Sequence, residues 1–167
     1  VVWLCAVPSA LRAVPLVGAW AVSLVSLITG VGVGGLARRW NAWAGLIAAL
    51  YMAASPYAVF YGRSIWQPNL LAPLSLAWAL TAYLGVTHTN RLGKICIGLN
   101  VFLGLFVVQV HFAGIALVPA TAYLFLRFRW WTRPKLPSVL IGAALAIAPM
   151  LPYGYSISLV CPTCLSR

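Results

Sequence analysis

The sequence predicts an all-α protein, a polytopic transmembrane helix bundle of about six helices. Hydrophobic residues make up 63% of the 167 residues and charged residues only 7%, whereas about a quarter of the residues in a soluble domain are charged. The mean hydropathy is +1.00. Long uncharged stretches alternate with short basic clusters, which is typical of membrane spans and their flanking loops. These observations exclude a soluble globular protein and predict one transmembrane domain over residues 1–167.

Four stretches are long enough to cross a bilayer as single helices, because a crossing needs about 20 predominantly apolar residues. The first precedes Arg38 and Arg39, and the third precedes a mixed polar loop at 87–94. The four predicted spans are residues 15–37, 42–61, 69–86 and 138–160, and none contains a charged residue.

The fifth stretch, residues 95–126, has a length that fits neither one crossing nor two. One helix of this length would be about 48 Å long, against a hydrocarbon core of about 30 Å. A single crossing would leave five basic residues on one side and six on the other. A turn near Gln109 to Gly114 instead leaves eight against three, as the positive-inside rule requires. We therefore predict a broken pair of short helices, about 95–109 and 112–126, with the bend covered by other helices.

This topology orients the chain in the membrane. The loops that carry Arg38, Arg91 and Arg127 are predicted to be cytoplasmic, and the 62–68 connection to lie on the far side. Tryptophans at span ends are typical of an interfacial aromatic belt. They are Trp40, Trp43, Trp66, Trp130 and Trp131. Gly30 and Gly34 form a small-xxx-small pair that we expect to pack within the bundle rather than in a dimer.

The charge balance excludes whole classes of function. Eleven Lys and Arg residues face no Asp or Glu, so a mechanism that needs a carboxylate cannot be completed within these 167 residues. A net charge of +11 invites a nucleic-acid partner. Because the basic clusters sit between apolar spans, we expect membrane lipid headgroups as partners and no nucleic acid.

Several polar residues are predicted to face one pocket on the non-cytoplasmic side. The turn between the second and third spans, the 109–114 bend and the outer end of the last span all lie there. Convergence of polar groups at one membrane depth often marks a ligand pathway, and an Arg among them suits a phosphate. The candidate ligand-binding residues are Arg63, Gln67, Asn69, Gln109, His111 and Tyr153.

Each candidate also has a structural interpretation. Arg63 alone is more often an interfacial residue whose head reaches water, and His111 is more often a hydrogen-bonded histidine than a base. For Gln109 and Asn100 the structural interpretation is a hydrogen bond between helices, which contributes about 0.6 kcal/mol. Cys161 and Cys164 have the spacing of half a metal or redox site, but no partners for them are evident. We therefore predict no metal site in this chain.

Short motifs resemble those of a known enzyme family. They run from Ser55-Pro56 through Val59-Phe60-Tyr61-Gly62-Arg63 to Trp66-Gln67-Pro68-Asn69, and continue with Gln109-Val110-His111-Phe112 and Pro152-Tyr153. This order resembles the GT-C membrane glycosyltransferases, in particular the protein O-mannosyltransferase and aminoarabinose-transferase group. The resemblance covers residues 12–155.

The resemblance implies transfer of a sugar from a polyprenyl-phosphate carrier to an acceptor on the extracytoplasmic face, in a bacterial inner membrane. In such enzymes an acidic residue in the first external loop acts as base or metal ligand, and a basic residue holds the carrier phosphate. Arg63 and His111 match family positions, whereas the acidic residue has no counterpart. We therefore expect a fragment of a longer protein, inactive alone, whose other parts supply the acid and, if one is used, a divalent metal.

Two other functions remain open from the sequence. A transporter or flippase segment would use the broken pair as its discontinuous helix. A purely structural membrane subunit would have its polar residues pointing to separate places rather than into one cavity.

Overall fold

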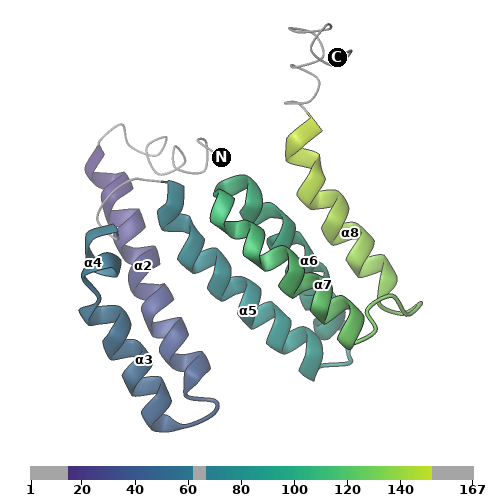
Figure 1. Cartoon of the computed structure of the whole chain (residues 1–167), viewed down its shortest axis with the longest axis horizontal. Helices are drawn as coiled ribbons and strands as arrows, with labels where there is room; N and C mark the ends of the chain where they lie inside the picture. Colours follow the sequence, from purple (N-terminus) through teal and green to yellow (C-terminus); the bar gives the residue numbers. More distant parts are fainter. Residues whose placement is uncertain (1–14, 62–66, 152–167) are drawn as a thin grey trace, which may run out of the picture.

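The computed structural model describes residues 15–61 and 67–151, and every regular element within these ranges is helical. The six predicted helices correspond to α2, α3 with α4, α5, α6, α7 and α8 (Figure 1). The bounds are α2 Pro15–Ala37, α3 Ala42–Ala54, α4 Pro56–Tyr61, α5 Leu71–Thr87, α6 Arg91–Val110, α7 Leu117–Arg127 and α8 Leu136–Ile147, with 3-10 turns η1 Gln67–Leu70, η2 Phe112–Ala116 and η3 Ala148–Met150.

Helices α2 and α3 form a closely packed hairpin. Asn41 caps α3, its side-chain oxygen accepting a hydrogen bond from the Trp43 amide at 2.9 Å. The helices approach so closely that a Cβ on Gly34 would lie 2.9 Å from the Ala49 Cβ, and one on Gly45 2.8 Å from the Gly34 carbonyl oxygen. The small residues of α2 thus pack within the bundle, as predicted.

The second predicted span is not one helix. α3 ends at Ala54, Ser55 is extended with φ −63° and ψ 116°, and α4 begins at Pro56. A proline disfavours helical backbone in the residue before it and fits the first position of a new helix. The span predicted over 42–61 is therefore two helices that meet at Ser55.

Helices α5 and α6 are antiparallel neighbours joined by a short turn. The side chain of Asn90 caps α6 by accepting from the Gly93 amide at 3.2 Å. Gly85 of α5 lies directly against Ile97, since an added Cβ would be 3.1 Å from that side chain. Farther along, Asn100 of α6 hydrogen-bonds to the Trp78 carbonyl of α5.

The broken pair is confirmed, but the prediction that other helices cover its bend is wrong at Phe112 and Ala113, which are exposed. α6 ends at Val110, His111 is extended, and the chain turns through η2 into α7. The predicted start at residue 95 is wrong, because Asn90 caps a helix of 20 residues that begins at Arg91. Of the two helices in the pair, only α7 is short. The first turn of α6 carries Arg91 and Lys94, which were predicted to lie in the loop.

Helix α8 packs against α6. A Cβ on Gly142 would meet the Gly98 carbonyl oxygen, and one on Gly98 would lie 2.8 Å from the Ser138 carbonyl oxygen. α8 ends at Ile147 and η3 continues to Met150. The rest of the predicted 138–160 span, from residue 152 on, lies outside the described residues, as do Cys161 and Cys164.

A Schellman motif ends α7. The Trp130 amide donates to the Phe125 carbonyl at 3.0 Å, and the Arg129 amide to the Leu126 carbonyl at 3.4 Å. Arg129 has a φ of 53°, a left-handed conformation that this motif requires and usually fills with glycine. The turn directs Trp130 back onto the helix that it ends.

Trp130 consequently lies in the core rather than in an aromatic belt. It is 0% exposed and packs with Ile97 and Val101 of α6. The prediction that Trp130 is interfacial is therefore wrong, because the reversal of the chain at Arg129 turns the indole inward. The exposures of the other described belt tryptophans agree with the prediction, at 75% for Trp40, 69% for Trp43 and 43% for Trp131, and Trp66 lies outside the described residues.

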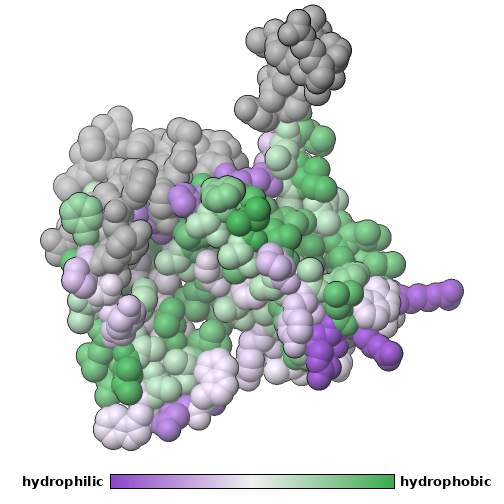
Figure 2. All heavy atoms as spheres, in the orientation of Figure 1, coloured by the Kyte–Doolittle hydropathy of each residue, from purple (hydrophilic) through white to green (hydrophobic). Residues whose placement is uncertain are grey.

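The described helices have the composition of an integral membrane protein. The segments Val17–Ala37 and Arg91–Val110 are long and apolar enough to cross a membrane, and the other helices are apolar but shorter. Hydrophobic side chains cover much of the visible face in Figure 2, and long hydrophilic side chains project from its right-hand edge. The connections α2–α3, α5–α6 and α7–α8 lie at one end of the bundle and the α6–α7 turn at the other (Figure 1).

Candidate functional site

The structure describes three of the six candidate side chains. Arg63 and Tyr153 lie outside the described residues, and so does the side chain of Gln67, whose backbone begins η1. Asn69, Gln109 and His111 are described, and each is partly buried.

These three residues lie at the same end of the bundle, which we call the polar end. The contacts of Asn100 with Trp78 and of Gly85 with Ile97 set the antiparallel register of α5 and α6. In this register η1, which contains Asn69, lies beside the last turn of α6 and contacts that helix. The end of α6 carries Gln109, and His111 follows it directly.

Gln109 ties two helices together at the polar end. Its side-chain amide nitrogen donates to the Ala146 carbonyl oxygen of α8 at 2.7 Å. Ala146 is 1% exposed, so this hydrogen bond lies in a buried part of the interface between α6 and α8. The structural interpretation considered for Gln109, a hydrogen bond between helices, is confirmed for the amide nitrogen.

His111 shapes the turn between α6 and α7. Its amide donates to the Val107 carbonyl at 3.0 Å and ends α6. Its ring Nδ1 then accepts from the Ala113 amide at 3.1 Å and caps η2. A ring nitrogen that accepts a hydrogen bond carries no proton, so this geometry assigns the ring proton to Nε2. No acceptor for Nε2–H is found among the described residues.

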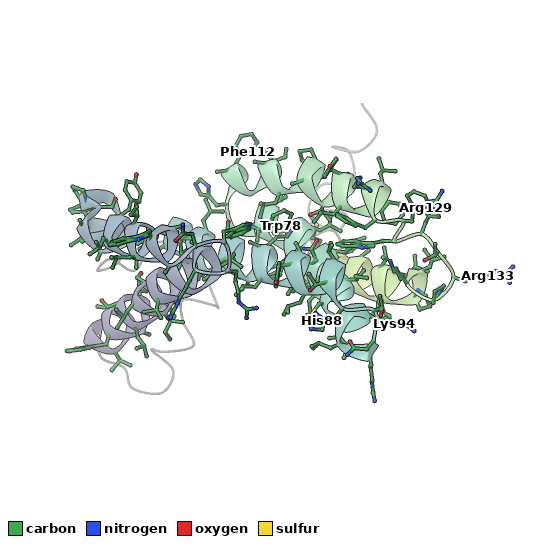
Figure 3. All side chains as sticks on the ribbon, turned by 90° about the horizontal axis from the view of Figure 1, so that it is seen from below. Trp78, His88, Lys94, Phe112, Arg129 and Arg133 are labelled. Carbon is green, nitrogen blue, oxygen red and sulfur yellow. The ribbon has the colours of Figure 1, made fainter. Side chains whose placement is uncertain are left out.

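A tight backbone approach keeps this turn folded against α6. A Cβ on Gly114 would lie 2.6 Å from both the carbonyl carbon and the carbonyl oxygen of Val107, so a larger residue would push η2 away. Phe112 points away from the bundle (Figure 3) and is 78% exposed. The turn thus fixes His111 while presenting an aromatic ring outward.

Gln109 and His111 make different hydrogen bonds, one to α8 and one within their own turn. The structure therefore brings these two residues and Asn69 to one end without joining Gln109 and His111 in a single network. Within the described residues, the donor that this arrangement leaves for a ligand is the Nε2–H of His111, which suits an oxygen-rich group.

A second group of polar side chains lies deeper in the bundle. The expected hydrogen bond of Asn100 between helices is confirmed, but sequence reasoning missed its partners. Trp78 Nε1 donates to Thr121 Oγ1 at 2.9 Å, which links α5 to α7. Asn100 Nδ2 donates to the Trp78 carbonyl at 2.8 Å and to Thr81 Oγ1 at 3.4 Å. Asn100 is 0% exposed. We call Trp78, Thr81, Asn100 and Thr121 the polar seam.

The seam holds three helices together in the middle of the bundle. A Cβ on Gly104 would collide with Thr121 Oγ1, so glycine is what lets α7 approach α6 here. Among the described residues, no donor reaches Asn100 Oδ1. An Asn and two Thr residues in the middle of predicted spans were the available signal, but only tertiary structure pairs them.

The fold and the two polar regions define a class of protein, a polytopic helical membrane protein with a broken helix pair and a polar end opposite a basic one. The family model for dolichyl-phosphate-mannose-protein mannosyltransferase matches residues 1–153. The chain belongs to this family, a group of membrane glycosyltransferases of the GT-C type. Comparisons with curated proteins and with solved structures found no match.

Proposed function

We propose that the polar end takes part in transferring a sugar from a polyprenyl-phosphate carrier to an acceptor hydroxyl on the extracytoplasmic side of a bacterial inner membrane. The family description supplies the donor chemistry, a dolichyl-phosphate-linked mannose, and a protein acceptor. The observation that supports the site most directly is the common placement of Asn69, Gln109 and His111 at the end remote from the basic loops. Family membership favours this function over the transporter that the broken pair also suggested.

In the proposed reaction the acceptor hydroxyl oxygen attacks the anomeric carbon of the sugar. The new bond is the glycosidic C–O bond, and the bond that breaks joins the anomeric carbon to the phosphate oxygen. The acceptor proton passes to a carboxylate, which a segment outside this sequence must supply because the chain has no Asp or Glu. The electron pair leaves on the phosphate, whose growing negative charge Arg63 stabilises.

The other candidate residues position the carrier phosphate. His111 Nε2–H is a donor carried by a fixed turn, since Nδ1 already accepts from the Ala113 amide. Gln109 acts as a positioning residue, because its hydrogen bond to α8 holds the end of α6 in place. Gln67, Asn69 and Tyr153 complete the proposed lining.

The described residues offer no site for the divalent metal that the resemblance allows. Within 15–61 and 67–151, no three His, Cys, Asp or Glu side chains gather. Hard divalent cations prefer oxygen ligands such as carboxylates, which this chain lacks. We assign no step of the transfer to a metal.

The role of Arg63 can be tested in the natural protein that carries this chain, assayed in membranes with polyprenyl-phosphate-linked mannose and a hydroxyl-bearing peptide. Arg63→Ala should lower transfer about 100-fold or more, the loss seen when one donor to a developing oxyanion is removed. Arg63→Lys should retain part of the activity, because it keeps the charge but not the paired N–H groups.

Thr89→Ala, in the exposed α5–α6 turn, serves as the control for insertion and expression. Wild-type transfer by Arg63→Ala, at an equal amount of inserted protein, would remove Arg63 from the mechanism.

A further inference from the structure

The end of the bundle opposite the polar end carries eight basic residues, on three connections and on the helix turns beside them. Arg129, Arg133 and Lys94 lie toward one end in Figure 3, well away from Phe112. Six of the eight are exposed, and Lys94 and Lys135 are partly buried. We call this surface the basic end; it consists of Arg38, Arg39, Arg91, Lys94, Arg127, Arg129, Arg133 and Lys135.

The connections that carry these charges have defined conformations. Asn41 and Asn90 cap α3 and α6 at their first turns. The Schellman motif fixes the backbone at Arg129. Lys135 Nζ donates to the Phe128 carbonyl at 3.2 Å, across the α7–α8 connection. The backbone that carries the basic residues is therefore held in place before any ligand binds, which lowers the entropy cost of binding.

No carboxylate of this chain neutralises the basic end, because the sequence contains no Asp or Glu. Two of the guanidinium groups rest on aromatic rings instead. Arg39 lies 5.8 Å from the centroid of Tyr83, and Arg127 lies 5.6 Å from that of Phe128. Such contacts leave the guanidinium N–H groups free to bind anions.

Four of the charges lie near the starts of α6 and α8, two helices that pack against each other. Gly98, in the third turn of α6, lies against the Ser138 carbonyl in the first turn of α8. Arg91 and Lys94 belong to the first turn of α6, and Arg133 and Lys135 precede α8. The amino terminus of each helix adds positive partial charge at this end of the bundle.

We propose that the basic end binds the headgroups of anionic phospholipids, with Arg91, Lys94, Arg133 and Lys135 as its main contacts. These groups adjoin apolar helices directly, so they lie at headgroup depth, where a polybasic segment meets anionic lipid. A nucleic acid would need the charges to stand clear of the membrane surface. The proposal does not depend on the transferase function, and its test contains no transfer assay.

The test compares lipid selectivity in bilayers. The chain is reconstituted into phosphatidylcholine bilayers with spin-labelled phosphatidylglycerol or spin-labelled phosphatidylcholine, and the protein-associated fraction of each is measured. The wild type should favour phosphatidylglycerol several-fold at low salt, and this preference should fall as salt rises. Replacing the four residues with Gln should lower the preference at least about fivefold or abolish it. The matched variant, with Arg91→Lys and Arg133→Lys, should keep it.

Circular dichroism of the reconstituted variants checks that the helices persist. If the fourfold Gln variant fails to fold, two double variants are tested separately, one at Arg91 and Lys94 and one at Arg133 and Lys135. Inorganic phosphate at 10 mM, used as a competitor, should not reduce the preference, because the ligand is a headgroup held at the membrane. Displacement by phosphate, equal association of both lipids, or a preference that survives in the Gln variants would overturn the proposal. So would tighter binding of a single-stranded oligonucleotide than of phosphatidylglycerol vesicles.

Discussion

At the scale of single residues, buried polar groups are used to join helices. Trp78, Asn100 and Thr121 all exchange hydrogen bonds across helix boundaries. In a membrane the gain from such a bond is modest, because the unfolded chain also finds polar partners in the bilayer. The polar seam therefore determines how α5, α6 and α7 are arranged more than it stabilises the fold.

Thr121→Val tests the seam, because it removes the acceptor for Trp78 Nε1 while keeping the shape of the side chain. We expect the free energy of unfolding in mixed micelles to fall by about 0.6 kcal/mol. Thr29→Val is the matched control. Thr29 is also buried, but its hydroxyl donates only to the Val25 carbonyl of its own helix. An equal loss for both variants would show that the bond between helices contributes nothing.

His111 can be tested separately from any role in transfer. His111→Ala removes the acceptor for the Ala113 amide and should destabilise η2 by about 1 kcal/mol, the usual value for losing a cap. The Ala113 amide should then exchange its hydrogen faster. His111→Asn should preserve protection, because Asn is among the best capping residues. Unchanged exchange in His111→Ala would show that the ring does not hold the turn.

At the scale of elements, glycines set how closely the helices approach. Gly142→Ala should destabilise the protein by about 1–3 kcal/mol, as overpacking does, since the new Cβ would meet the backbone of Gly98. Gly35→Ala is the control, because nothing lies within 4 Å of an added Cβ at Gly35. It should be neutral or stabilising, since alanine favours a helix more than glycine does. A Gly142→Ala variant as stable as Gly35→Ala would contradict the close α6–α8 contact.

The lengths of the apolar stretches predicted those helices whose bounds depend only on the thickness of the bilayer. The span 15–37 ends with α2 at Ala37, and the broken pair follows from a stretch too long for one crossing. The break at Ser55 depends on one proline, which hydropathy ignores. The burial of Trp130 depends on a left-handed residue one position earlier, which composition does not indicate.

At the scale of the whole molecule, the two ends differ in chemistry. Loop charge predicted this division, and the common end of Asn69, Gln109 and His111 agrees with it. The hydrogen-bond partners of Gln109 and His111 could not be predicted, because they depend on where α8 ends and how the η2 turn closes. Arg63 and Tyr153 remain predictions.

The central claim is that the polar end and the basic end face opposite sides of the membrane. Single cysteines can test it in a variant whose four natural cysteines, Cys5, Cys96, Cys161 and Cys164, are replaced by alanine. Ala113→Cys reports on the polar end and Thr89→Cys on the basic end. Both positions are exposed, and neither change removes a charge.

The decisive measurement is labelling of these two variants in intact cells by a membrane-impermeant maleimide. The account predicts that Ala113→Cys is labelled at once and Thr89→Cys only after the membrane is opened. Labelling of both from outside, or of Thr89→Cys alone, would contradict it.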